Sequence, residues 1–114
     1  MFSTTIHPLK WYRDKQVTVV GLGAFGGGAG VTQFLHSLGA RLTVTDLKTA
    51  EELEEQVAAL DGLDIRWVLG EHREEDLLGA DLIVLNPAVQ RDIPLVRMCL
   101  DAGVPLETEM NLFF

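Results

Sequence analysis

The chain has 114 residues, which is enough for one domain with a single core and too few for two. Apolar residues make up 47% and charged residues 23% of it, a balance that excludes disordered, collagen-like and coiled-coil proteins. Nine basic and seventeen acidic side chains give a net charge of −8, which argues against a nucleic-acid partner, because nucleic-acid-binding proteins neutralise phosphates with basic side chains.

The N-terminus and the cysteine content predict a compartment. The single cysteine, Cys99, cannot form a disulfide within the chain, which favours a reducing environment. Residues 1–15 lack the apolar stretch of a secretory signal, and no run reaches the roughly 18 apolar residues of a membrane span. We therefore expect a cytoplasmic protein with no membrane segment, in which residues 1–15 form a lead-in and residues 16–114 form one domain.

Apolar runs alternate with helical patterns from Gln16 onward. The β-branched run Val17–Val20 is typical of a strand buried on both faces of a parallel sheet. A helix is expected over 26–38, with Gly39 as its C-terminal stop. The second strand is expected over Arg41–Thr45.

The second half of the chain continues this alternation. Thr49 and Glu52 have the spacing of a capping box at the start of a helix expected over 49–60. Further strands are predicted over 65–69, 81–86 and 104–107, a helix over 94–102 and an amphipathic tail over 109–114. Together these elements predict an α/β fold, a Rossmann-like, doubly wound, five-stranded parallel sheet with the strand order 3-2-1-4-5.

The first strand runs into the motif GLGAFG, which opens the first helix. Gly21 permits the tight turn, Gly23 a close approach of backbone to ligand, and Gly26 close helix packing. Because the exposed N–H groups of a helix start attract phosphate, the motif predicts a nucleotide site. Asp46, at the tip of the second strand, can accept hydrogen bonds from a ribose or a base, and we expect it to serve a ligand rather than the core. The alternative is that the glycines serve only packing.

Other polar residues give weaker signals. The acidic stretches 51–55 and 71–76 are expected to be solvated surface, because no metal-ligand or acid–base spacing accompanies them. His7, His36 and His72 are isolated from one another in the sequence, and no nucleophile can be assigned. The chain contains no G-x-x-x-x-G-K-[ST] run, so it carries no recognisable ATP triphosphate site.

The segment Asn86-Pro87-Ala88 follows the fourth strand. In open α/β sheets, ligands bind in the crevice outside the carboxyl ends of the strands, where the first and second strands also end. Asn86 is therefore either a ligand contact or part of a structural turn.

Longer strings carry a more specific signal than any single motif. VTVVGLGAFG, LGARLTVTD and ADLIVLNPAVQRDIPLVRMCLDAGVPLETEMNLFF occur in this order over residues 16–114. Together they resemble the N-terminal domain of the bacterial Mur ligases, in the branch that adds D-glutamate to UDP-N-acetylmuramoyl-L-alanine. In that family the glycine turn reads GLG-x-[ST]-G, the fourth strand runs into a Ser-Pro-Gly turn, and the domain closes on an Ile-Glu-Leu-Phe-like ending.

The resemblance implies that the domain binds the UDP part of the muropeptide substrate at the start of its first helix. Phe25, Leu47 and Ala88 depart from the family pattern, which has small hydroxyl residues at the first two positions and glycine at the third. Lys48 would offset part of the negative charge that opposes an anionic ligand. By motif position, the UDP-binding residues would be Gly23, Ala24, Phe25, Gly26, Asp46, Leu47, Lys48, Asn86, Pro87 and Ala88.

The resemblance also implies where the chemistry takes place. In the family, ATP and Mg²⁺ activate the substrate carboxylate as an acyl phosphate, and the D-glutamate amine then displaces the phosphate. Central and C-terminal domains hold those groups, so this chain is expected to contain no catalytic residue, no metal and no cofactor of its own. The alternative from the glycine motif and Asp46 alone is an NAD(P)- or FAD-binding domain of an oxidoreductase or regulator.

Overall fold

The computed structural model describes residues 8–22, 27–86 and 94–108 of the chain. Its strands are β1 (Gln16–Val20), β2 (Arg41–Asp46), β3 (Ile65–Leu69), β4 (Leu82–Leu85) and β5 (Leu106–Thr108). Its helices are the 3₁₀ helix η1 (Leu9–Tyr12) and the α-helices α1 (Gly27–Ser37), α2 (Glu54–Ala59), α3 (Glu74–Leu78) and α4 (Pro94–Asp101).

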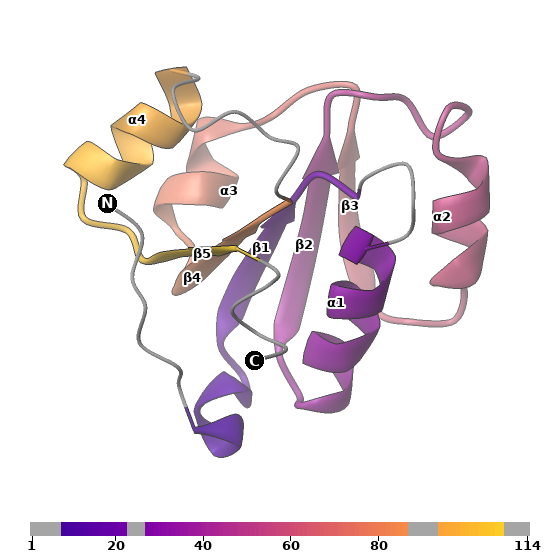
Figure 1. The fold of residues 1–114 in the computed structure, drawn as a ribbon, viewed down its shortest axis with the longest axis horizontal. Coiled ribbons are helices and arrows are strands. Elements are labelled where there is room, and N and C mark those ends of the chain that lie inside the picture. Colours follow the sequence, from indigo (N-terminus) through magenta and orange to yellow (C-terminus); the bar gives the residue numbers. More distant parts are fainter. Residues whose placement is uncertain (1–7, 23–26, 87–93, 109–114) are drawn as a thin grey trace.

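The five strands form one parallel sheet in the order β3-β2-β1-β4-β5, which confirms the predicted fold class and topology. Helices α1 and α2 lie against one face of the sheet and α3 and α4 against the other (Figure 1). The central strand β1 and its neighbour β4 are buried along almost their whole length, as the runs of β-branched and aliphatic residues predict.

Successive side chains of β1 enter two separate apolar clusters. Val17 and Val19 pack into the cluster that also contains residues of α1 and the residues flanking α2, whereas Val20 packs with residues of α3 and α4. Tyr12 of η1 is buried in the first cluster and Trp11 packs against it. The end of the predicted lead-in therefore lies against the body of the domain.

Helix α1 ends at Ser37, one residue before the predicted end, and Gly39 follows as its predicted stop. Gly39 has a φ of 85°, a conformation that side chains with a Cβ rarely adopt. Its N–H donates to the His36 carbonyl at 3.0 Å, and the Ala40 N–H donates to the Leu35 carbonyl at 3.3 Å. These bonds pair carbonyls that the last helical turn leaves open, and they direct the chain into β2.

The predicted capping box forms, but the helix after it is shorter than expected. The Thr49 N–H donates to Glu52 Oε1 at 3.2 Å, and the Glu52 N–H donates to Thr49 Oγ1 at 3.3 Å. Leu53 then has φ −106° and ψ 19°, outside the α-helical range, so the regular helix begins only at Glu54 rather than at 49.

The prediction that residues 71–76 are solvated surface is wrong for the end of the stretch. Glu74–Leu78 forms α3, in which Asp76 and Leu77 are buried. The backbone carbonyl of Asp76 accepts a hydrogen bond from Thr18 Oγ1 at 2.8 Å, which fixes the helix on β1. A helix this short has no hydrophobic periodicity that could reveal it in the sequence.

Several element ends differ from the predictions by one or two residues. Strand β2 continues to Asp46, β4 starts one residue after Asp81, and β5 occupies Leu106–Thr108 rather than 104–107. Asp81 still contacts the start of β1, because its Oδ2 accepts the Gln16 N–H and its own N–H donates to the Gln16 carbonyl, both at 2.8 Å. The predicted tail over 109–114 lies outside the described residues. Within the part that is described, no helix has the length and apolarity needed to cross a bilayer.

Candidate functional site

The five parallel strands end at one edge of the sheet, and the direction of winding reverses there. The chain leaves β1 toward β2 and β3, and later returns to place β4 on the other side of β1. A crevice at such a switch point is where open α/β sheets bind ligands. The residues that follow β1, β2 and β4 at this edge are therefore the candidate site.

The glycine turn begins in the conformation that its motif requires. Gly21 has a φ of 86°, and its N–H donates to the Thr45 carbonyl of β2 at 2.8 Å. Leu22 follows and is fully buried. Four predicted site residues of this turn, Gly23, Ala24, Phe25 and Gly26, lie outside the described residues, and α1 starts directly after them.

Asp46 connects the glycine turn to the end of β2. Its Oδ2 accepts the Leu22 N–H at 3.0 Å, and its Oδ1 accepts the Lys48 N–H at 2.9 Å. The expectation that Asp46 serves a ligand rather than the fold is therefore incomplete, because both carboxylate oxygens accept hydrogen bonds from backbone N–H groups. Each carboxylate oxygen can accept a second hydrogen bond, so this bracing leaves Asp46 able to accept ligand hydroxyls.

The two residues after Asp46 project from the same edge. The Leu47 side chain is 65% exposed, and Lys48 is also exposed. Their backbone is held to the end of β3, because the Gly70 N–H donates to the carbonyls of Asp46 and Lys48, both at 2.9 Å. An apolar and a cationic side chain therefore lie beside Asp46, on a loop whose backbone is hydrogen-bonded to Gly70.

Asn86 borders the end of β1 from the other side. Its N–H donates to the Val20 carbonyl at 3.0 Å, and the residue is only 7% exposed. Asp46 and Asn86 therefore flank the exit of β1 from β2 and β4 respectively. The predicted contacts Pro87 and Ala88 lie outside the described residues.

The loop after β3 adds residues to this edge that the sequence did not single out. The buried Thr45 Oγ1 donates to the Glu71 carbonyl at 2.9 Å and lies 2.7 Å from His72 Nδ1. Burial lowers the pKa of His72 below its ordinary value, and the negative charge of Asp46 partly offsets this effect. Sequence spacing between histidines could not reveal this contact, because the partner is a threonine on another strand.

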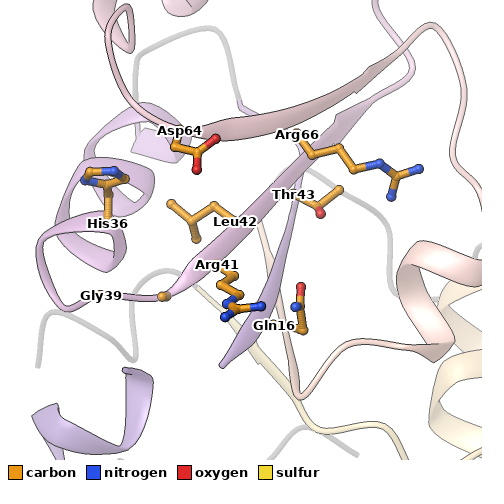
Figure 2. A pocket seen from close by; sticks show the side chains of 9 residues that line it. Gln16, His36, Gly39, Arg41, Leu42, Thr43, Asp64 and Arg66 are labelled. Atoms are coloured by element: carbon orange, nitrogen blue, oxygen red, sulfur yellow. The ribbon is translucent and has the colours of Figure 1, made fainter. Parts of the chain in front are cut away.

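Two hollows in the described surface lie away from the edge where the strands end. One, of about 620 Å³, surrounds the start of β2, with Arg41 and Gln16 on one side of the strand and His36 and Asp64 on the other (Figure 2). A second, of about 200 Å³, lies between α3 and the sheet. No predicted site residue lines either hollow.

The described residues offer no assembled metal site. Over 8–22, 27–86 and 94–108, no three His, Cys, Asp or Glu side chains come close enough together to hold an ion. Cys99 is a free thiol buried against α3, and burial raises its pKa.

At the edge formed by the ends of β1, β2 and β4, the chain offers hydrogen-bond acceptors, a helix start and a cation. These groups suit the binding of a nucleotide.

Comparisons with known proteins indicate the family of the chain. Residues 15–107 match the family described as "Mur ligase MurD-like, N-terminal domain". Curated proteins named UDP-N-acetylmuramoylalanine–D-glutamate ligase are 46% identical over 100 residues in Roseiflexus sp. (strain RS-1), 42% over 100 residues in Trichlorobacter lovleyi and 41% over 103 residues in Treponema pallidum.

These alignments cover most of the present chain and a small part of each relative. They include 88%, 88% and 89% of the chain, and 22%, 22% and 19% of the three ligases. The chain therefore spans about a fifth of the length of the curated relatives it matches.

Proposed function

Because the chain belongs to the MurD-like N-terminal domain family of the Mur ligases, we propose that it binds the uridine diphosphate part of UDP-N-acetylmuramoyl-L-alanine. The complete ligase would add D-glutamate to this substrate during peptidoglycan synthesis. One arrangement supports the proposal above all others: Asp46 bonds to the glycine turn at Leu22, at the switch point of the sheet.

The diphosphate is proposed to lie over the start of α1. The first N–H groups of a helix have no partner within it, and the helix dipole places partial positive charge there. Gly23, Ala24, Phe25 and Gly26 precede this helix and would contact the phosphates by their position in the family motif. Lys48 would add a positive charge in a chain whose net charge is −8.

The uridine is proposed to lie between the ends of β2 and β4. Asp46 would accept a ribose hydroxyl with lone pairs that Leu22 and Lys48 leave free. The exposed Leu47 side chain would cover part of the base, and Asn86, with Pro87 and Ala88 after it, would line the other wall.

The bond-forming chemistry is proposed to take place outside this chain. The sequence has no phosphate-binding lysine loop, so ATP, Mg²⁺ and D-glutamate would be held by parts of the ligase that these residues do not include. The chain would bind and orient the substrate without contributing a catalytic residue. We place the ligase in the cytoplasm, the kind of reducing compartment that a free Cys99 favours.

Ligand-observed NMR tests this proposal directly. UDP, UDP-N-acetylmuramoyl-L-alanine, NAD and ATP are offered to the chain at equal concentrations. We expect weak binding of the two uridine nucleotides, with competition between them for one site, and little binding of NAD or ATP. A clear preference for NAD would contradict the proposal and favour a dinucleotide site, which the glycine turn and Asp46 could also form.

A further inference from the structure

The loop after β3 holds a histidine ring at the edge where the strands end. His72 Nδ1 lies 2.7 Å from Thr45 Oγ1, which in turn lies 2.9 Å from the Glu71 carbonyl. Thr45 is fully buried, and it precedes Asp46 in β2. The position of the ring is therefore set by a buried side chain and does not depend on solvent contacts.

These two contacts determine which ring nitrogen carries the proton. A threonine hydroxyl has one proton to donate, and the Glu71 carbonyl can only accept, so the hydroxyl proton points to Glu71. The hydroxyl oxygen must then accept from His72, which puts the N–H on Nδ1. In the neutral ring, Nε2 consequently carries a lone pair and can act only as an acceptor.

The ring lies beside the predicted nucleotide site. Thr45 is the register partner of Val20, the last residue of β1, and the Gly21 N–H donates to the Thr45 carbonyl. Glu71, the residue before His72, forms an isolated β-bridge with Asp46, whose carboxylate accepts the Leu22 N–H. His72 itself is only partly buried, in contrast to Thr45.

We propose that His72 contacts the nucleoside, and that its Nε2 accepts a hydrogen bond from a ribose hydroxyl or from the N–H of the uracil ring. A phosphate is excluded as the partner of Nε2 because phosphate oxygens, like this nitrogen, only accept. His72 therefore contacts the uridine, while the helix start and Lys48 contact the diphosphate. The inference rests on the proposed binding of UDP at this edge.

Two substitutions separate the two ring nitrogens. His72→Asn places an amide N–H near the position of Nδ1 and has no atom at Nε2, so it retains the bond to Thr45. His72→Gln places an amide oxygen near the position of Nε2 and gives up the bond to Thr45. We expect His72→Asn to keep the wild-type melting temperature and to lose about three- to tenfold in UDP affinity, the value of one hydrogen bond.

The opposite pattern is expected for His72→Gln, with a lower melting temperature and UDP affinity close to that of the wild type. His36→Asn, at the opposite edge of the sheet, is the matched control and should change neither UDP affinity nor the set of bound nucleotides. Wild-type affinity in a fully folded His72→Asn would overturn the inference while leaving the proposed function intact. Absence of UDP binding by the wild type would overturn both.

Nucleotide analogues identify the donor. UDP, its 2′-deoxy and 3′-deoxy forms and an N3-methylated form are titrated into the wild type and His72→Asn. The analogue that lacks the bonded donor should bind both proteins equally, whereas the others should still distinguish them. Equal discrimination by all four would overturn the inference. Long-range ¹H–¹⁵N spectra give a separate readout, because a proton found on Nε2 of the free protein would also contradict it.

Discussion

The Oδ2 atom of Asp46 accepts the N–H of Leu22 at 3.0 Å, although the two residues are 24 positions apart in the chain. The bond joins the end of β2 to the turn between β1 and α1. The carboxylate that would bind a ribose is thereby also the group that orients the backbone leading to the phosphate site. Loss of Asp46 should therefore affect both the fold of this edge and the binding of a nucleotide.

We predict that Asp46→Ala lowers the free energy of unfolding by about 1–3 kcal/mol, because two backbone N–H groups, of Leu22 and Lys48, lose their acceptor. UDP affinity should fall at least tenfold. Chemical denaturation and UDP titration measure the two effects. Asp61→Ala, which removes an exposed carboxylate from the loop after α2, is the control and should change neither quantity.

The two effects can be separated with Asp46→Asn. The amide keeps one acceptor oxygen for the backbone, so we expect a smaller loss of stability than in Asp46→Ala. Its second polar atom is a donor and cannot accept from a ribose hydroxyl. Unchanged stability in Asp46→Ala would show that the bonds to Leu22 and Lys48 contribute little in solution.

A second prediction concerns the ion pair between Arg66 of β3 and Asp76 of α3. The Asp76 side chain is 3% exposed and that of Arg66 is 51% exposed. Arg66→Ala would leave a buried carboxylate without its cation, and we expect the free energy of unfolding to fall by about 1–2 kcal/mol. This loss is smaller than for a fully buried pair because solvent screens the half-exposed Arg66 side chain.

Arg73→Ala serves as the control for this prediction. Arg73 pairs with Glu71 at 3.6 Å, and both side chains are largely exposed, so its loss should cost less than about 0.5 kcal/mol. The double variant Arg66→Ala with Asp76→Leu should recover part of the stability, because it removes the buried charge as well as its partner. Equal losses in Arg66→Ala and Arg73→Ala would contradict a stabilising role for the buried pair.

The sequence was sufficient for the sheet and its order because hydrophobic runs and turn signals are local. Val17–Val20 has the unbroken apolar pattern of a central parallel strand, and Gly39 ends α1 by its own backbone preference. The family, too, was predicted correctly, since the order of several motifs along the chain is more specific than one glycine turn. These signals do not depend on which side chains meet in space.

Contacts between distant residues were the part that the sequence could not supply. Helix α3 was missed because five residues are too few to show a helical period, and the burial of Asp76 depends on Arg66 and Thr18 from two strands. His72 was judged isolated because no other histidine is near it in sequence, whereas its partner is Thr45. The predicted UDP contacts of this chain stay predictions.

The third prediction concerns the pH dependence of stability. Burial lowers the pKa of His72 in the folded protein, so between the folded and unfolded pKa values the unfolded state binds more protons. Stability should therefore decrease as the pH falls from about 6.5, the unfolded value, toward the folded pKa. Denaturation midpoints at pH 7.5 and 5.5 should differ more in the wild type than in His72→Asn, and identical differences would show that His72 does not contribute.

The last prediction concerns Lys48 and the charge of the chain. A net charge of −8 repels a diphosphate, and Lys48 places a cation on the loop after β2 at the edge where the nucleotide is proposed to bind. We expect Lys48→Gln to weaken UDP binding about two- to fivefold at low salt, and this difference should shrink at about 0.5 M salt because exposed charges are screened. Lys10→Gln removes the same charge from η1, away from the edge where β2 ends, and should have a much smaller effect. If both variants weaken binding equally, the cause is the net charge of the chain and Lys48 has no local role in holding the phosphates.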